Sequence, residues 1–196
     1  ESQFVIIGGG KTGMDAIIWL LENNKEANDI HWIIPRDSWI LNREFIQPGK
    51  FLEQSQIKFA EQMIAIAEST DKNDAFERLE DIKFLFRINP NINPTMYRCA
   101  TITEIELKPL QKIENVVRDG HVKEITKNGI EMESGLHKFP QNTIYIDCTS
   151  DGLAKREVQP IFNGEMITLQ TVRFCQQVFS AAFIAHVELM NKSEEE

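Results

Sequence analysis

A glycine-rich turn between two apolar runs constrains the fold more than any other feature of the sequence. Residues 4–7 (Phe-Val-Ile-Ile) form a continuous apolar run, which is typical of a strand buried on both faces of a parallel sheet. Residues 14–22 carry apolar side chains at helical spacing, and residues 30–34 form a second apolar run that ends at Pro35. This order predicts a βαβ unit, with residues 8–13 as the turn after the first strand.

The turn matches the pattern G-x-G-x-x-G at Gly8, Gly10 and Gly13. In such a loop the first glycine makes the tight turn, the second lets the backbone approach a pyrophosphate, and the third lets helix and strand pack closely. The helix start adds free N–H groups and a positive dipole end. The sequence therefore predicts a dinucleotide site. Its expected contacts are Gly8, Gly9, Gly10, Lys11, Thr12 and Gly13. The Thr12 hydroxyl is expected to bond a phosphate, whereas Lys11 either adds charge there or points to solvent.

Two other interpretations of the turn are open. Gly10-Lys11-Thr12 matches the end of the P-loop motif GxxxxGK[ST], but that motif requires a glycine five residues before Gly10, where the chain has Val5. The nucleotide-triphosphatase interpretation is therefore disfavoured. The other alternative is a glycine-rich turn that binds nothing.

The end of the second strand bears on the choice of cofactor. NAD sites place Asp or Glu there for the ribose 2′-hydroxyl, whereas an arginine accommodates the 2′-phosphate of NADP. Arg36 stands at about the right distance from the loop, with Ser38 beside it, and a guanidinium fork suits phosphate. NADP is therefore favoured. NAD stays open because Asp37 could serve it, and Arg36 has the alternative of a solvent-facing charge.

The rest of the chain is expected to complete an α/β fold: a Rossmann-like parallel sheet with flanking helices and a small antiparallel β-meander. Helices are predicted over residues 51–86 with a break near 69–73, over 103–112 with a capping box of Thr103 and Glu106, and over 178–190. Strands are predicted at residues 116–117 and 143–148. A hairpin over residues 121–132 turns at Asn128-Gly129.

Composition excludes several classes of function. A formal net charge of −9 argues against nucleic acid or an acidic membrane surface as a partner. The apolar stretch at 178–190 contains His186 and Glu188 and is too short to span a bilayer. Three scattered cysteines form no CxxC pair or zinc spacing, which favours thiols in a reducing cytoplasm. No pairing of histidine, cysteine, serine or acids predicts a catalytic residue or a metal site.

Four segments resemble the NADP-binding part of two-dinucleotide flavoproteins, a class that includes flavin-dependent monooxygenases and related pyridine-nucleotide oxidoreductases. The likeness is greatest to a group of mostly uncharacterised FAD/NAD(P)-binding proteins. The segments are residues 4–16, 32–39 (Trp-Ile-Ile-Pro-Arg-Asp-Ser-Trp), 94–101 (Pro-Thr-Met-Tyr-Arg-Cys-Ala-Thr) and 146–152 (Ile-Asp-Cys-Thr-Ser-Asp-Gly).

The resemblance implies a domain organisation. Residues 1–147 would form the NAD(P)-binding domain, with a helical insertion around 51–112. Residues 148–192 would return to the FAD-binding domain, with Thr149 and Gly152 near the cofactors and residues 167–190 as its closing strand and helix. Residues 193–196 read as a tail. FAD would need a further portion of the same chain, because no second glycine fingerprint is present; the Cys-x-x-Cys of disulfide reductases and the FxGxxxHxxxW motif of monooxygenases are missing too.

The expected function is to bind NADP(H) and present it for hydride transfer to flavin in an FAD-dependent oxidoreductase of the cytoplasm. The alternative is a non-catalytic Rossmann module that acts as a dinucleotide sensor or scaffold. The partners expected are the nucleotide cofactor and the FAD-binding portion, without nucleic acid or membrane. A homo-oligomer stays open.

Overall fold

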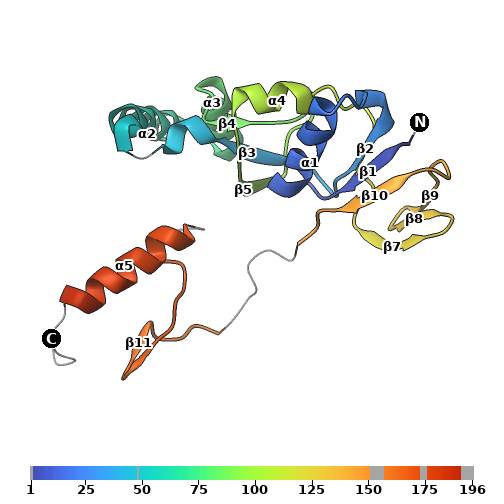
Figure 1. The fold of residues 1–196 in the computed structure, drawn as a ribbon. Helices are drawn as coiled ribbons and strands as arrows, with labels where there is room; N and C mark the ends of the chain where they lie inside the picture. The colour runs from blue at the N-terminus through green and yellow to red at the C-terminus, as the bar shows by residue number, and fades with distance from the viewer. Residues whose placement is uncertain (1, 48, 151–156, 173–175, 191–196) are drawn as a thin grey trace. The chain divides into compact units, whose positions relative to one another are not determined.

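The computed structural model describes residues 2–47, 49–150, 157–172 and 176–190 (Figure 1). The chain divides into two compact units, Glu1–Ser150 and Asp151–Glu196, and each is described by itself.

A four-stranded parallel sheet forms the centre of the first unit. It contains β1 (Phe4–Ile7), β2 (Ile30–Ile33), β6 (Val116–Val117) and β10 (Ile144–Asp147), in the order β10-β1-β2-β6. The helix α1 (Lys11–Glu22) and the short 3₁₀ turn η1 (Ala27–Asp29) connect β1 to β2, so the predicted βαβ unit is confirmed. The predicted turn is too long. The helix begins at Lys11 rather than Met14, because the helical hydrogen bonds already start with Met14 N donating to Gly10 O at 3.2 Å.

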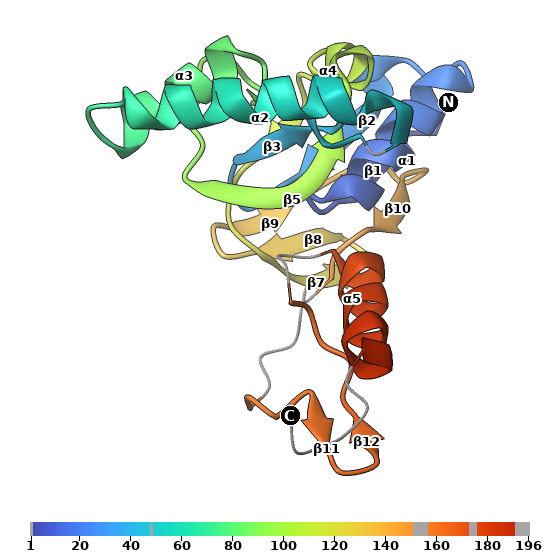
Figure 2. The ribbon, with the colours of Figure 1, turned by 90° about the vertical axis from the view of Figure 1, so that its left-hand side faces the viewer.

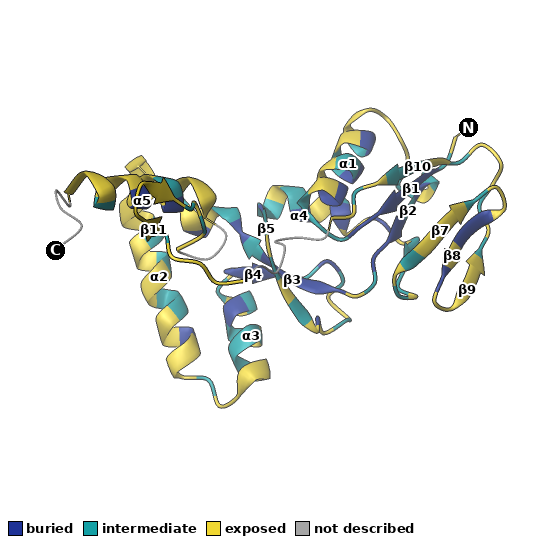
Figure 3. Cartoon of the chain, turned by 90° about the horizontal axis from the view of Figure 1, so that it is seen from below, coloured by how far each residue is buried: buried dark blue, intermediate teal, exposed yellow. Residues whose placement is uncertain are grey.

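Both faces of the parallel sheet are covered, as the apolar run of β1 predicts, and every residue of β1 is buried (Figure 3). Phe4 and Ile6 pack with α1 and α4 (Glu104–Leu110) on one face, whereas Val5 and Ile7 pack against Ile130 on the other. That second face is covered by an antiparallel sheet of β7 (Val122–Thr126), β8 (Gly129–Met132) and β9 (Gly135–His137). The unit is thus layered as helices, parallel sheet and antiparallel meander (Figures 1 and 2), and the predicted α/β class and meander are confirmed.

A second sheet is formed by the chain between β2 and β6 of the parallel sheet. Its strands are β3 (Ser38–Asn42), β4 (Leu85–Phe86) and β5 (Met96–Ile102); β3 pairs parallel with β5 and antiparallel with β4. The helices α2 (Leu52–Ala67) and α3 (Lys72–Asp81) and the 3₁₀ turns η2 (Arg43–Ile46) and η3 (Gly49–Phe51) lie between β3 and β4. The prediction of helix up to residue 86 is therefore wrong at its end. Leu85 and Phe86 are held in a strand because they pair with Leu41 and Ile40.

The helix α4 and the hairpin confirm two local predictions. Thr103 caps α4, with Glu106 N donating to Thr103 Oγ1 at 3.3 Å and Thr103 N donating to Glu106 Oε2 at 2.6 Å. The strands β7 and β8 pair antiparallel around Asn128-Gly129.

The second unit contains the short hairpin of β11 (Phe162–Asn163) and β12 (Met166–Ile167), and the helix α5 (Gln177–Met190). The helix predicted over residues 178–190 is confirmed. Among the described residues, no helix has the length and apolar character needed to cross a membrane.

Candidate functional site: the glycine loop

The glycine loop lies at the carboxyl ends of the parallel strands β1 and β2. Gly8 N donates to Ile33 O at 2.9 Å, and the buried Trp32 indole donates Nε1–H to Gly8 O at 2.9 Å. The loop is therefore tied to the second strand by both a backbone and a side-chain hydrogen bond. This edge of an open parallel sheet is where α/β folds bind their ligands.

Two of the three motif glycines are required by sterics. Gly8 has a φ of +120°, and a Cβ atom there would lie 2.8 Å from Cys148 O. A Cβ atom on Gly13 would lie 2.4 Å from Gly8 O, which is far inside van der Waals contact. Both obstacles are backbone atoms, so no side-chain rotation relieves them. Gly8 makes the turn and Gly13 brings α1 onto the loop, as the motif predicts.

Gly10 is different, because nothing crowds it. The nearest atom to a Cβ on Gly10 is Nη1 of Arg98, at 4.0 Å, whereas a Cβ on Gly9 would meet Ile34 Cγ2 at 3.1 Å. Gly10 is the N-cap of α1 and no side chain caps the helix there. The open space over Gly10 is therefore the place where a phosphate group can approach the backbone.

The start of α1 offers backbone donors to that space. The first helical bond is donated by Met14, so the N–H groups of Lys11, Thr12 and Gly13 have no partner in their own helix. Thr12 is exposed. These groups and the positive end of the helix dipole suit an anion.

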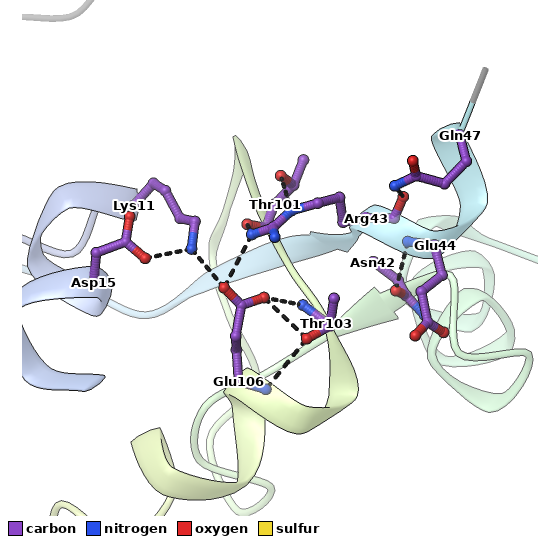
Figure 4. A network of polar contacts seen from close by, with 9 residues as sticks. All are labelled: Lys11, Asp15, Asn42, Arg43, Glu44, Gln47, Thr101, Thr103 and Glu106. Carbon is purple, nitrogen blue, oxygen red and sulfur yellow. Dashed lines mark hydrogen bonds and ion pairs between the residues drawn. The ribbon is translucent and has the colours of Figure 1, made fainter. Parts of the chain in front are cut away.

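Lys11, one of the predicted phosphate contacts, is engaged elsewhere. Its Nζ lies 2.5 Å from Asp15 Oδ1 and 2.8 Å from Glu106 Oε1, and Arg43 Nη2 lies 3.1 Å from the same Glu106 oxygen (Figure 4). Burial tends to raise the pKa of Glu106, but the hydrogen bonds from Lys11, Thr103 and Arg43 together lower it to about 2. The network joins α1 to α4 and to η2, so the charge of Lys11 is used for structure.

Asp37 and Arg36, the residues after β2 that were expected to distinguish NAD from NADP, have different surroundings. Asp37 is buried and paired with Arg118, with Nε to Oδ2 at 2.5 Å and Nη2 to Oδ1 at 3.1 Å. Arg36 is exposed, and no hydrogen bond or ion pair joins it to another described residue. Ser38 is buried at the first position of β3. Each carboxylate oxygen of Asp37 thus accepts a hydrogen bond from Arg118, whereas Arg36 has no partner among the described residues.

The end of β10 adds Thr149 to the same edge of the sheet. Cys148 N donates to Ile7 O at 2.8 Å, next to Gly8. Thr149 donates to Asp147 Oδ1 from Oγ1 at 2.7 Å and from its N–H at 2.9 Å, and these two bonds lower the pKa of Asp147. Gly152, which was also predicted to lie near the cofactors, falls outside the described residues.

The sequence did not single out Arg98 as a site residue. It lies in the middle of β5, opposite Ile40 of β3, and its guanidinium reaches the loop next to Gly10. The available signals were its place after the loop at 89–94, where it could line a cleft or serve packing, and its place in the segment at 94–101 that resembles the flavoproteins. Because β5 was not predicted, nothing in the sequence placed Arg98 beside the loop.

Comparisons with known proteins find relatives without assigned functions. The chain is 46% identical over 189 residues to uncharacterised proteins of Mycobacterium tuberculosis and Mycobacterium bovis. The match covers 96% of this chain but 35% of each relative, so the chain spans about a third of their length. No protein-family model and no solved structure matches the chain.

Proposed function

We propose that this chain is the NADP(H)-binding part of an FAD-dependent oxidoreductase and presents the dinucleotide for hydride transfer to flavin. The observation that carries the proposal is the steric pattern of the glycine loop. Glycine is obligatory at Gly8 and Gly13, where backbone packs on backbone, and open space lies over Gly10, where a pyrophosphate would come.

Each part of the dinucleotide has a candidate partner. The N–H groups of Lys11, Thr12 and Gly13 and the Thr12 hydroxyl would hold the pyrophosphate. Arg36 would hold the 2′-phosphate of NADP, which a guanidinium binds in a forked geometry. The pairing of Asp37 with Arg118 supports NADP over NAD, because the carboxylate that could accept from a ribose 2′-hydroxyl is buried in an internal pair.

The flavin half of the proposal rests on the four segments that resemble two-dinucleotide flavoproteins. The chemistry supplied by NADPH in such proteins is donation of a hydride, and the protein contributes binding and orientation. The region matched is 35% of each mycobacterial relative, which leaves ample length for a second nucleotide-binding domain.

Replacement of Arg36 tests the cofactor assignment. Loss of a charged hydrogen bond costs about 1.5–3 kcal/mol, so Arg36→Ala should weaken NADPH binding about ten- to a hundredfold and leave NADH binding nearly unchanged. Isothermal titration calorimetry with each dinucleotide measures both affinities. Lys123→Ala, which removes one exposed charge from β7 on the meander, is the control. Equal losses for NADPH and NADH would refute the assignment of Arg36 to the 2′-phosphate.

The alternative of a non-catalytic dinucleotide sensor has one observation in its favour. Burial raises the pKa of the Cys148 thiol, with the charge of Asp147 adding to the effect, and this disfavours the reactive thiolate form. An absorption spectrum of a full-length mycobacterial relative separates the two functions. A flavin spectrum that bleaches with NADPH supports the oxidoreductase, and a colourless protein that binds NADPH supports the sensor.

A further inference from the structure

Arg98 presents a buried polar atom that its neighbours do not satisfy. Its Nε is shielded from solvent and has no hydrogen-bond partner. Within the described part of the chain, no hydrogen bond or ion pair joins the guanidinium to another residue. A guanidinium stays charged in proteins and carries five N–H donors. Since buried donors are nearly always bonded, an arginine in this state calls for an explanation, and an absent anionic ligand is a direct one.

The position of Arg98 indicates which anion this is. Nη1 lies 4.0 Å from the point that a Cβ atom on Gly10 would occupy, and among the described residues that are not chain neighbours of Gly10 no other atom comes within 4 Å of that point. The N–H groups at the start of α1 have no helical partner, and in a helix such groups point toward the N-terminal end, where Gly10 is the N-cap. Backbone donors from α1 and a guanidinium from β5 therefore converge over Gly10 from two different elements.

We infer that Arg98 binds the pyrophosphate of the dinucleotide. The inference rests on the proposed function and adds to it a residue from the second sheet, far from the glycine motif in sequence. Arg98 approaches Gly10, the glycine that lets a pyrophosphate near the backbone, whereas Arg36 follows β2, where the 2′-phosphate is read. The two arginines thus have different tasks. Arg98 contacts the part that NADPH and NADH share, and Arg36 contacts the part in which they differ.

The positive charge of Arg98 also replaces the charge that Lys11 does not supply. Lys11 Nζ is held by Asp15 and Glu106 and points to α4. Without Arg98, only neutral N–H groups and the helix dipole would face the two charges of the pyrophosphate. The cation that faces the pyrophosphate therefore comes from β5 rather than from the loop.

The test compares Arg98→Met with wild type and with Arg36→Ala, titrated with NADPH and with NADH. We expect Arg98→Met to weaken both dinucleotides by about tenfold or more and to the same degree, as expected for a charge-assisted phosphate contact. Arg98→Lys keeps the charge but loses the fork, and should bind with intermediate affinity. The melting temperature of Arg98→Met should equal or exceed that of wild type, because methionine fills a similar length and leaves no buried donor unbonded.

The outcomes separate this inference from the proposed function. Undiminished binding by Arg98→Met in a chain whose wild type binds NADPH overturns the inference alone. A loss confined to NADPH also overturns it, because Arg98 would then contact the 2′-phosphate. A lower melting temperature for both Arg98 variants, with unchanged affinity, indicates a structural role and overturns it as well. If wild type binds neither dinucleotide, the proposed function itself is refuted, and the inference falls with it.

Discussion

Substitution of Gly13 and Gly10 by alanine separates the structural and the binding roles of the loop. At Gly13 the new Cβ would lie 2.4 Å from Gly8 O, about 1 Å closer than ordinary contact. The obstacle is a backbone oxygen of the loop, so α1 must move away from β1. Overpacking of this kind costs about 1–3 kcal/mol of stability. The higher helix propensity of alanine offsets up to about 1 kcal/mol of that cost. We expect Gly13→Ala to lower the free energy of unfolding by about 1–2 kcal/mol.

Gly10→Ala is the matched control, because the same methyl group meets only open space. Its φ of −89° and ψ of 178° suit alanine, and the nearest atom is Arg98 Nη1 at 4.0 Å. Loss of the glycine N-cap lowers the stability, whereas the lower entropy of an unfolded chain with alanine raises it. Each effect is under about 1 kcal/mol, so the free energy of unfolding should change little. The methyl group would occupy the space of the pyrophosphate, so NADPH binding should still fall.

Thermal unfolding followed by circular dichroism, together with NADPH titration, gives both readouts. For a chain of this size 1 kcal/mol corresponds to about 2–4 °C, so Gly13→Ala should melt about 2–8 °C below wild type. Gly10→Ala should melt within about 2 °C of wild type and bind NADPH at least about tenfold more weakly. Wild-type stability and affinity in Gly13→Ala would refute the steric argument. Wild-type affinity in Gly10→Ala would refute the placement of the pyrophosphate over Gly10.

Two further predictions concern the ion pairs around the loop. Arg118→Ala leaves the buried Asp37 carboxylate without its partner and should destabilise the chain by about 1–3 kcal/mol in urea unfolding, since Arg118 itself is partly exposed; a variant as stable as wild type would show that the pair is dispensable. The pKa of Glu106 is lowered from 4.5 to about 2, so its ionised form stabilises the fold above pH 4.5 and this contribution disappears as the pH falls towards 2. Glu106→Gln should flatten the acid limb of the stability profile in that window, and an unchanged limb would contradict the network around Lys11.

The sequence predicted the first βαβ unit, the capped helix α4 and the hairpin of β7 and β8, because each has a local signal. The burial of β1 on both faces follows from four consecutive apolar residues, and the cap of α4 from Thr103 and Glu106 at the required spacing. The steric demand for glycine at Gly8 and Gly13 was likewise predictable from the motif.

The second sheet could not be predicted, because its strands depend on distant partners. β4 has only two residues, and it is a strand because it pairs with β3 across two intervening helices. β5 contains Tyr97, Arg98 and Cys99, which give no apolar alternation. For the same reason two contacts of the candidate site could not be predicted. Arg98 lies near the loop because it belongs to β5, and Arg118, which follows β6, pairs with Asp37. Spacing in the sequence shows neither approach.

The pairing of charges around the loop explains how a chain with a net charge of −9 could bind a polyanion. The cations nearest the fold's own carboxylates are already used: Lys11 and Arg43 by Glu106, and Arg118 by Asp37. Among the described residues discussed around the loop, the arginines without an internal partner are Arg36 and Arg98. At long range a net charge of −9 repels a phosphate, so the affinity must come from close contacts, which salt screens only weakly when they are partly buried. Arg98 beside the start of α1, and Arg36 after β2, are cations of the kind that such close contacts need. The repulsion from acidic groups farther away than a Debye length is largely screened by salt.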